Sequence, residues 1–161
     1  MVSRTAKILA VSSSGGHWVQ LMRMRPAWDG LDVAYLTTEA SYRDQVDQYA
    51  SDRGLARPRF HTCILATRWQ KLRLLRQLLQ ILLVLLRERP DVIISTGAAA
   101  GFFALRLGKL IGARTIWVDS IANAGEMSLS GKKAKSCADA WLTQWPDLAG
   151  DDGPDHWGSV L

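Results

Sequence analysis

Residues 11–20 read VSSSGGHWVQ and follow directly on a short apolar run, KILAV, at residues 7–11. An apolar run without alternation is typical of a strand buried on both faces of a parallel sheet. Gly15 and Gly16 can take positive φ and bring the backbone close to a ligand. A helix predicted over residues 17–24 would direct its free N–H groups and its positive dipole end at the same place. The stretch therefore predicts a strand, an anion-binding turn and a helix.

The alternation of strand and helix continues along the whole chain. Strands are predicted at residues 7–12, 32–37, 59–65, 91–95 and 114–118, and a last apolar stretch covers 138–142. Helices are predicted at residues 17–24, 41–52, 69–88 and 132–136, and between the turn TGAAAG at 96–101 and residue 110. This pattern predicts an α/β fold, a Rossmann-like doubly wound parallel sheet with right-handed crossovers.

Ligands bind such sheets at the carboxyl ends of the strands. Polar and glycine-rich residues fall at those ends in this chain: Ser12 to His17, Thr37 and Thr38, Ser95 to Gly97, and Asp119 with Ser120. We therefore expect a binding site along this edge of the sheet.

A length of 161 residues fits one ordinary domain. Apolar residues make up 48% and charged residues 22%, which is typical of globular proteins and excludes disorder as the default. We expect the domain over residues 1–145 and a flexible or partner-ordered tail, rich in Pro, Asp and Gly, over residues 146–161. Cys63 and Cys137 belong to no paired spacing and are expected to be buried and reduced.

The sequence lacks the motifs of several common nucleotide-binding, hydrolytic and metal sites. The glycine loop does not have the G-x-G-x-x-G order, so an enzyme that binds a nicotinamide dinucleotide is kept only as an alternative. The nearest approach to a Walker A loop, at residues 125–132, has one residue too many between its glycines. A G-x-S-x-G nucleophile elbow is absent. The three histidines are isolated and the chain has two cysteines, so we expect neither a metal site nor a cofactor.

Two residues are candidates for a general base. His17 would sit in the first helical turn, where the dipole favours the neutral imidazole that accepts a proton. It could equally contact a diphosphate or cap the helix. Asp119, after the strand predicted at residues 114–118, is the competing base, with an N-cap or a pairing role toward a nearby cation as its structural alternative.

The segment at residues 69–88 is the longest predicted helix. Its longest charge-free run, residues 77–86, has ten residues and is too short to cross a bilayer. One leucine face is expected to cover the sheet: Leu72, Leu75, Leu79, Leu82, Leu83 and Leu86. Between Arg68 and Arg89, six basic residues against Glu88 alone account for the net charge of +5, and those near both ends would suit an anionic membrane surface. A buried crossover helix and a membrane-contacting or partner-contacting helix both fit this pattern.

Three blocks of sequence together resemble one family. They are SSSGGHWVQ at residues 12–20, PDVIISTGAAAG at residues 90–101 and VDSIANAGEMSLSGKKAKSCADAWLTQWPDL at residues 118–148. They look like the PssD-type exopolysaccharide glycosyltransferase subunits and their eukaryotic relative, the membrane subunit of the dolichol-linked UDP-N-acetylglucosamine transferase. The first two blocks are also similar to the N-terminal, acceptor-binding half of the peptidoglycan enzyme MurG.

The resemblance implies the N-terminal, acceptor half of a GT-B glycosyltransferase, in which two Rossmann-like domains face each other across a cleft. A separate donor-binding subunit would then hold the UDP-sugar, which is a substrate and not a cofactor, and would be required for activity. This chain would bind a polyprenol-diphosphate-linked saccharide in exopolysaccharide or capsule biosynthesis. We expect it to be cytoplasmic and peripheral on the inner face of the cell membrane, without the N-terminal anchor of its eukaryotic relative and without a nucleic-acid partner.

The resemblance also assigns residues. Catalysis is expected from His17 or Asp119. The acceptor and its diphosphate would be held by Ser13, Ser14, Gly15, Gly16, Thr96, Gly97, Asn123, Ser128, Ser130, Gly131 and Lys132. Contact with the anionic membrane is expected from Arg68, Trp69, Lys71, Arg73 and Arg76. A non-catalytic scaffold that recruits a complete transferase to the membrane is the alternative function.

Overall fold

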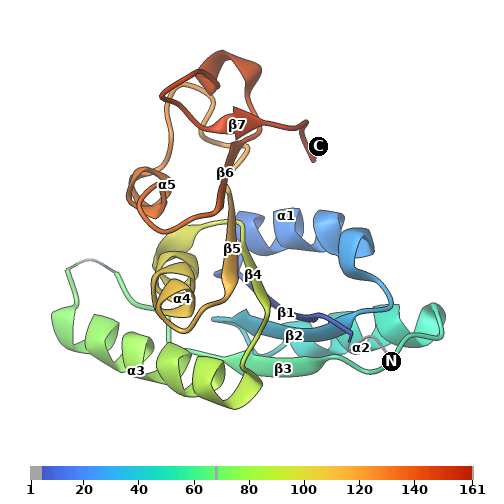
Figure 1. Cartoon of the computed structure of the whole chain (residues 1–161). Coiled ribbons are helices and arrows are strands. Elements are labelled where there is room, and N and C mark those ends of the chain that lie inside the picture. The colour runs from blue at the N-terminus through green and yellow to red at the C-terminus, as the bar shows by residue number, and fades with distance from the viewer. Residues whose placement is uncertain (1–4, 68, 161) are drawn as a thin grey trace.

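Seven parallel strands form the sheet of the computed structural model, which describes residues 5–67 and 69–160 (Figure 1). Their order across the sheet is β3-β2-β1-β4-β5-β6-β7. The strands are β1 (Lys7–Val11), β2 (Asp32–Thr37), β3 (Arg59–Thr62), β4 (Val92–Ser95), β5 (Arg114–Val118), β6 (Ala140–Thr143) and β7 (Asp155–His156). The helices are α1 (Gly16–Met24), α2 (Tyr42–Asp52), α3 (Lys71–Glu88), α4 (Ala98–Leu110) and α5 (Leu129–Ala134), with 3₁₀ helices η1 (Arg25–Trp28) and η2 (Pro146–Leu148). The predicted Rossmann-like α/β fold is confirmed.

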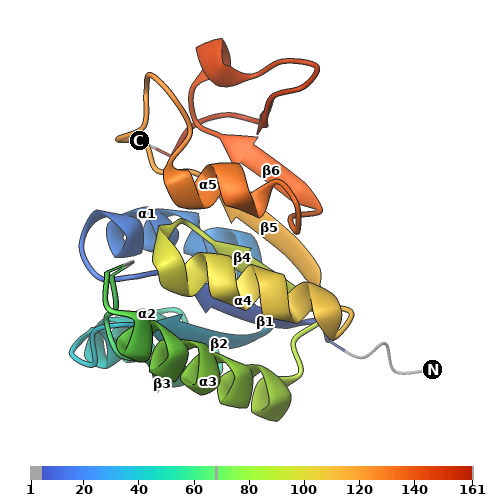
Figure 2. The ribbon, with the colours of Figure 1, turned by 90° about the vertical axis from the view of Figure 1, so that its left-hand side faces the viewer.

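The helices divide into two groups that cover opposite faces of the sheet. Figures 1 and 2 show α3, α4 and α5 on one face, with α1 and α2 on the other. Strand β1 supplies both sides because successive side chains of a strand alternate. Leu9 and Val11 join the core cluster that contains residues of α3, α4 and α5, whereas Ile8 and Ala10 join the cluster that contains residues of α1 and α2. The sheet is thus the common wall of two apolar cores.

The register of the strands brings their carboxyl ends together. Val11 at the end of β1 lies beside Leu36 of β2 and Ser95 of β4. Ser95 in turn lies beside Trp117 of β5. The loops that follow β1, β4 and β5 therefore leave the sheet at one edge, where the sequence predicts the site.

Several predicted boundaries are wrong: β3 ends at Thr62 and not at residue 65, and α3 begins at Lys71 and not at residue 69. Four of the six residues of the turn predicted at 96–101 are helical, because α4 begins at Ala98 and its three alanines are strong helix formers. The helix predicted at residues 132–136 begins earlier, at Leu129, because the Ser128 side chain accepts a hydrogen bond from the Gly131 N–H and caps it.

The leucine face that the sequence assigns to the sheet is instead the exposed face of α3. Leu72 is 84% exposed and Leu83 is 67% exposed, and Leu75, Leu79 and Leu86 are also exposed. The buried stripe contains Ile81 and Leu85 together with two polar residues, Gln77 and Glu88. Leucines surround most of this helix, so their spacing alone does not define an inner face. The hydrogen-bond partners of Gln77 and Glu88 determine which face of the helix is buried.

Both buried polar residues of α3 bond to the segment around β3. Gln77 Nε2 donates to the Ile64 carbonyl at 2.7 Å. Glu88 accepts from Arg59 Nε at 2.7 Å and pairs with His61 Nε2 at 2.6 Å. Burial raises the pKa of the Glu88 carboxyl, but the hydrogen bonds and charges of Arg59 and His61 outweigh it, so the pKa lies below its usual value.

Glu88→Gln is expected to lower the free energy of unfolding by about 1–3 kcal/mol near neutral pH, because Arg59 and His61 lose their charged partner. A carboxyl with a lowered folded-state pKa stabilises the fold above its unfolded pKa, and this stabilisation is lost as the pH falls through the folded-state pKa. The difference between variant and wild type should therefore shrink on acidification. Urea unfolding at a series of pH values measures it, and a constant difference would contradict the assignment.

The tail predicted after residue 145 contributes to the sheet. β7 pairs in parallel with β6, and beyond it Ser159 Oγ donates to the Gln144 carbonyl at 2.5 Å. The Val160 N–H donates to Gln144 Oε1 at 2.9 Å. The boundary predicted at residue 145 therefore falls between two paired strands of the sheet, β6 and β7. The buried residue Gln144 holds the end of the chain through these hydrogen bonds, and no periodicity in the sequence predicts its burial.

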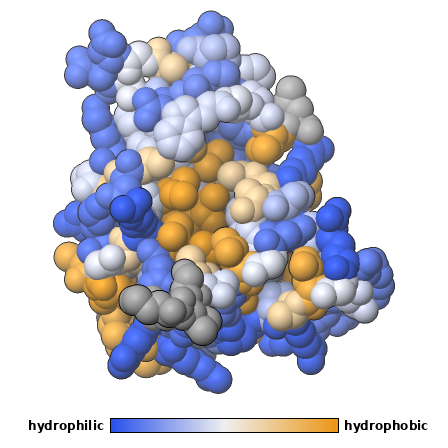
Figure 3. Space-filling model, turned by 45° about the vertical axis from the view of Figure 1, so that its right-hand side comes forward, coloured by the Kyte–Doolittle hydropathy of each residue, from blue (hydrophilic) through white to orange (hydrophobic). Residues whose placement is uncertain are grey.

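Hydrophobic side chains remain accessible on the face that carries α1 and α2. Figure 3 shows them gathered in a hollow between hydrophilic rims. Val33, Val92 and Ile116 are partly buried residues that pack against the core on this side. Contiguous apolar areas on protein surfaces often contact other molecules.

Cys63 and Cys137 are both free and buried, as predicted. Burial raises the pKa of the Cys63 thiol to about 11, which keeps it protonated.

Within residues 5–67 and 69–160, no helix is long and apolar enough to cross a membrane.

Candidate functional site

The first loop joins β1 to α1 at the carboxyl edge of the sheet, and part of its backbone is already bonded. The Ser14 N–H donates to Thr38 Oγ1 at 3.0 Å, and the Gly15 N–H donates to Tyr42 Oη at 3.1 Å. Two of the groups predicted to bind an anion are therefore satisfied inside the protein. Thr38 is one of the strand-end residues that the sequence places at this edge of the sheet, whereas nothing in the sequence signals Tyr42.

The first turn of α1 leaves other amides available. The Val19 N–H is the first to bond back within the helix, to the Gly15 carbonyl at 3.1 Å. Gly15, with φ 78°, is the N-cap residue and holds a left-handed conformation without Cβ strain. The N–H groups of Gly16 and His17 therefore have no intrahelical acceptor, and they lie at the positive end of the helix dipole. Of the first-loop residues predicted to bind an anion, Gly16 therefore keeps an N–H group that the helix leaves unpaired, and His17 adds a second one.

His17 connects this helix to the second small-residue loop. Its Nδ1 lies 2.8 Å from the Thr96 carbonyl oxygen, and Thr96 Oγ1 donates to the His17 carbonyl at 2.7 Å. A carbonyl oxygen can only accept, so Nδ1 of the neutral ring carries the hydrogen and Nε2 carries the lone pair. The contact fixes both the ring orientation and the tautomer. A histidine held this way is suited to accept a proton at Nε2.

The second loop can approach His17 only because residue 97 is glycine. A Cβ on Gly97 would lie 2.4 Å from Cε1 and Nδ1 of the His17 ring, and the φ of Gly97 is 139°. The next residue, Ala98, has φ 65°, which is unusual for a residue with a side chain. Such backbone strain is found at functional sites, where the surrounding structure maintains it.

Asp119 is buried beneath the site, with 1% of its surface exposed. Its carboxylate accepts four hydrogen bonds, from Trp117 Nε1 at 3.1 Å, Asn123 Nδ2 at 3.2 Å, the Ser128 N–H at 2.8 Å and Ser128 Oγ at 2.6 Å. A carboxylate whose oxygens are occupied in this way holds the loop of residues 120–128 in place. The geometry therefore favours a structural role for Asp119, with neutral donors as its partners instead of the predicted cation, and leaves His17 as the candidate base with an available lone pair.

Gln20 supports the loops of the candidate site from below and was not assigned to it from the sequence. Its side chain is buried, donates to the Asp119 carbonyl at 3.1 Å and accepts from the Ile121 N–H at 3.2 Å. It lies one helical turn after His17, so both residues project from one face of α1. A polar residue at that spacing is the signal that could have found it. Gln20 couples the first loop to the third.

A cavity of about 480 Å³ opens where these loops meet. Five residues predicted to form the site line it: His17, Asn123, Ser128, Ser130 and Lys132. Ser120, Glu126 and Leu129 also line it and were not assigned to the site from the sequence. The other predicted residues do not line the cavity: Ser13, Ser14, Gly15, Gly16, Thr96, Gly97, Asp119 and Gly131. Gly131 has a packing role, since a Cβ there would lie 2.7 Å from Asp119 Oδ1.

Lys132, the cationic side chain in the lining of this cavity, is paired with a carboxylate. Lys132 Nζ donates to Glu126 Oε2 at 2.6 Å. This hydrogen bond, with the charge of Lys132, lowers the pKa of the Glu126 carboxyl, so the carboxylate is ionised at neutral pH. An anionic ligand that approaches Lys132 must therefore compete with Glu126.

The residues predicted to contact a membrane lie elsewhere, at the start of α3. Trp69, Lys71, Arg73 and Arg76 are exposed, and none of them lines the cavity. Arg68 lies outside the described residues. In the part of the chain that the structure describes, no three His, Cys, Asp or Glu side chains are grouped so that they could hold a metal ion.

Comparison with known families matches residues 59–160 to the family described as Oligosaccharide biosynthesis protein Alg14 like. The chain belongs to the Alg14-like family. It is 38% identical over 69 residues to the UDP-N-acetylglucosamine transferase subunit ALG14 of Yarrowia lipolytica, a match that covers 39% of this chain and 32% of the relative. It is 40% identical over 67 residues to the corresponding subunit of Schizosaccharomyces pombe, covering 37% and 31%. The chain thus spans about a third of the length of these relatives.

Solved structures share the fold of this Alg14-like chain at low sequence identity. MurG from Acinetobacter baumannii matches with a TM-score of 0.70 and 9% identity, over 94% of this chain and 45% of MurG. UDP-N-acetylglucosamine 2-epimerase from Rickettsia bellii matches with a TM-score of 0.64 and 13% identity, over 97% of this chain and 45% of the epimerase. The chain therefore has the fold of somewhat less than half of each of these larger proteins.

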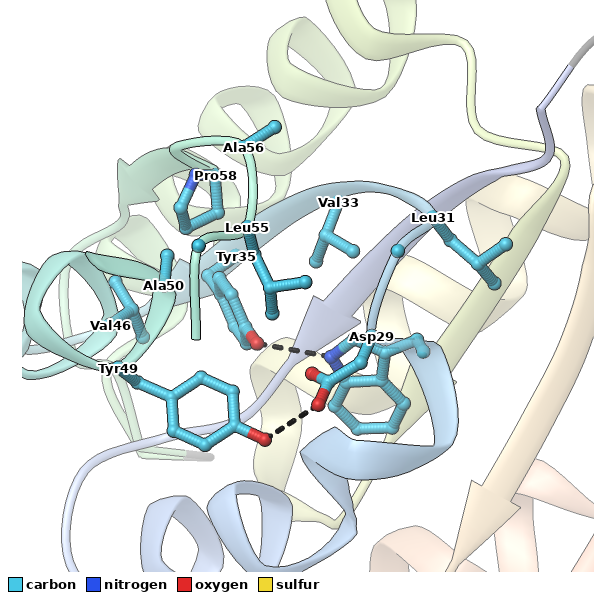
Figure 4. A pocket seen from close by; sticks show the side chains of 13 residues that line it. Asp29, Leu31, Val33, Tyr35, Val46, Tyr49, Ala50, Leu55, Ala56 and Pro58 are labelled. Carbon is cyan, nitrogen blue, oxygen red and sulfur yellow. Dashed lines mark hydrogen bonds between the residues drawn. The ribbon is translucent and has the colours of Figure 1, made fainter. Parts of the chain in front are cut away.

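A second pocket of the Alg14-like chain, about 240 Å³ in volume, is separate from the candidate site. It lies between η1, the start of β2 and α2 (Figure 4). Tyr49 Oη donates to Asp29 Oδ2 at 2.8 Å, and Trp28 Nε1 donates to Tyr35 Oη at 3.0 Å. These polar groups satisfy one another, so the pocket presents chiefly aromatic and aliphatic surface. It shares no residue with the cavity around His17.

Asp119→Asn in the Alg14-like chain is expected to lower the free energy of unfolding by about 2 kcal/mol, because an amide group would direct a donor at the donors of Ser128. Urea unfolding measures the change. Asp147→Asn, on the exposed η2, is the matched control and should leave stability unchanged. Full stability of the Asp119 variant together with a loss of turnover would contradict the structural role and restore Asp119 as a base.

Proposed function

We propose that this chain is the acceptor-binding, membrane-associating subunit of a two-subunit, PssD-type glycosyltransferase. The enzyme would transfer a sugar from a UDP-sugar, held by a separate donor-binding subunit, to a polyprenol-diphosphate-linked saccharide in exopolysaccharide or capsule biosynthesis. The observation that carries the proposal is the His17 ring, held by the Thr96 carbonyl with its Nε2 lone pair available, beside the free amides that begin α1. Membership of the Alg14-like family supports it.

The diphosphate of the acceptor would bind at the start of α1, where the N–H groups of Gly16 and His17 and the helix dipole favour an anion. His17 Nε2 would take the proton from the acceptor hydroxyl as its oxygen attacks the anomeric carbon. A new carbon–oxygen bond forms, the bond from the anomeric carbon to UDP breaks, and UDP leaves with the electron pair. Positioning of the acceptor and removal of its proton are the two contributions of this chain.

Lys132 would assist only after it exchanges its carboxylate partner for a phosphate. Its pairing with Glu126 keeps the ammonium at the cavity in the free protein. A diphosphate carries more charge than one carboxylate and can compete for the same donors. The amides of α1 are therefore the first contacts of the anion in this proposal.

Two surfaces support association with other components. The exposed leucines of α3, flanked by Lys71, Arg73 and Arg76, have the composition of an interfacial helix that rests on anionic lipid. The apolar hollow of Figure 3, on the opposite side of the sheet, supports a second subunit that covers it. The protein would then act at the cytoplasmic face of the cell membrane as a peripheral component.

Replacing Leu72, Leu79 and Leu83 together with serine is expected to weaken binding to vesicles that contain phosphatidylglycerol by at least about tenfold, because apolar area no longer enters the lipid. The three side chains are exposed, so the free energy of unfolding should change little. Serine at Val19, Leu110 and Ile111, which are exposed elsewhere, is the matched control and should leave vesicle binding intact. Vesicle flotation measures both, and equal losses in the two triple variants would contradict a membrane-facing α3.

The function is tested by co-expressing the chain with a candidate donor-binding subunit and following transfer of a labelled sugar to a polyprenol-diphosphate-linked acceptor. We expect transfer only when both subunits are present. Transfer by either subunit alone would contradict the division of labour between them.

A further inference from the structure

Another hollow, of about 600 Å³ and distinct from the pocket of Figure 4, adjoins the cavity that contains His17. It lies between the segment before α3 and the beginnings of α4 and α5, and its lining includes Leu74, Phe102, Phe103 and Lys133. Leu129 and Ser130 line both hollows. The two spaces therefore meet at the first turn of α5. We refer to the hollow lined by Leu74, Phe102, Phe103 and Lys133 as the α4 groove.

The two spaces differ in chemistry. The first presents polar groups of His17, Asn123 and Ser128, whereas the α4 groove is mainly apolar. Phe102 and Phe103 are partly buried, with ring centroids 5.8 Å apart, and form an aromatic wall. Together the spaces match an amphiphile that has an anionic head and an apolar chain.

Cations lie where the head and the chain of such a molecule would join. Lys132 lines the polar cavity and Lys133 lines the α4 groove, so each space has one of two consecutive lysines that follow the shared residues on α5. Leu129, at the junction, is 63% exposed although it is apolar. An exposed leucine between two hollows is explained if a ligand covers it.

The far end of the α4 groove reaches the helix with the exposed leucines. Leu74 of α3 lines the groove, and Leu72 and Leu75 on the same helical turn are exposed. Figure 2 shows α3, α4 and α5 side by side on one face of the sheet, with α4 in the middle. The groove thus connects the leucine face of α3 with the cavity of His17.

We propose that the α4 groove binds the first isoprene units of the polyprenyl chain of the acceptor, next to its diphosphate. The inference rests on the proposed function and names the part of the protein that receives the lipid. Its volume lies in the range of pockets that enclose small ligands, so it holds a short segment of the chain while the remainder stays in the bilayer. The groove would draw the diphosphate out of the membrane surface and place the attached saccharide at His17.

The test uses the whole chain without a donor subunit and three soluble probes: dimethylallyl, geranyl and farnesyl diphosphate. Calorimetric titration should show affinity that rises with chain length, by roughly tenfold or more from the shortest to the longest probe, because each buried methylene adds to binding. Leu74→Gln, at the far end of the groove, should weaken farnesyl diphosphate about fivefold or more and leave dimethylallyl diphosphate unchanged, because only the longer chain reaches this residue. Leu110→Gln, at the exposed far end of α4, is the matched control and should change neither.

A photoreactive benzophenone analogue of farnesyl diphosphate supplies a measurement that does not depend on a variant. Cross-links should fall on Phe102, Phe103 or Leu129. Affinity that is independent of chain length, or cross-links confined to other surfaces, would overturn the proposal even if sugar transfer by the two-subunit enzyme is observed. Length-dependent binding at these residues without any sugar transfer would keep the groove and reject the proposed function. The two ideas can therefore fail separately.

Discussion

His17→Ala lowers the rate of sugar transfer by the two-subunit enzyme by a factor of about 10²–10⁴, the usual contribution of a positioned general base. The effect is expected because Thr96 fixes the ring with Nε2 available, and among the described residues that line the cavity no other ionisable side chain is free of a partner. The carboxylate of Glu126 is paired with Lys132, and that of Asp119 is buried under four donors. Transfer of labelled sugar under single-turnover conditions measures the loss.

Val19→Ala is the control for the His17 variant. Val19 is exposed on the same helix, so its truncation reports any general effect of altering α1. Both variants should retain the unfolding midpoint of the wild type and should co-purify with the donor subunit. A His17 variant with an unchanged transfer rate would remove the base from this chain and favour the non-catalytic scaffold.

Gly97→Ala is expected to lower the free energy of unfolding by about 2–4 kcal/mol and to abolish most of the transfer activity. Two effects add at this position. The φ of 139° is unfavourable for a residue with a side chain, and the new Cβ would lie 2.4 Å from the His17 ring. The ring must therefore leave the Thr96 carbonyl, which destroys the tautomer and orientation required of the base. Urea unfolding and the transfer assay measure the two losses.

Gly112→Ala separates the backbone effect from the clash. Gly112 has φ 87°, but a Cβ there would meet no atom within 4 Å. It should cost only the backbone strain, about 1–2 kcal/mol, and leave transfer intact in the fraction of protein that is folded. Equal stability losses at the two positions, with activity retained by both, would contradict the close approach of the second loop to His17.

Much of the fold follows from local sequence. Apolar runs such as KILAV and RTIWV are continuous and short, and glycine or proline separates them from helical segments, so periodicity and punctuation locate them. The bounds predicted for β2 and β5 are those of the structure. The edge that carries the site also follows, because ligands bind a parallel sheet at the carboxyl ends of its strands.

The orientation of α3 could not be predicted from its sequence. Leucines occupy most positions around the helix, and the inner face is selected by Gln77 and Glu88, whose partners Ile64, Arg59 and His61 come from the segment around β3. A polar residue is buried where another element satisfies it, and this depends on which strand lies beneath the helix.

The sequence by itself determined the alternating elements, the glycine loops and the presence of His17 at the start of a helix, because these depend on backbone preferences and on near neighbours in the chain. Tertiary structure decided what each site residue can do. Contacts with Thr38 and Tyr42 occupy amides of the first loop, and four donors occupy Asp119. The Thr96 carbonyl, 79 residues away, sets the tautomer of His17. Hydrogen-bond partners that are distant in sequence meet only when the sheet brings their loops together, so they leave no local signal in the chain.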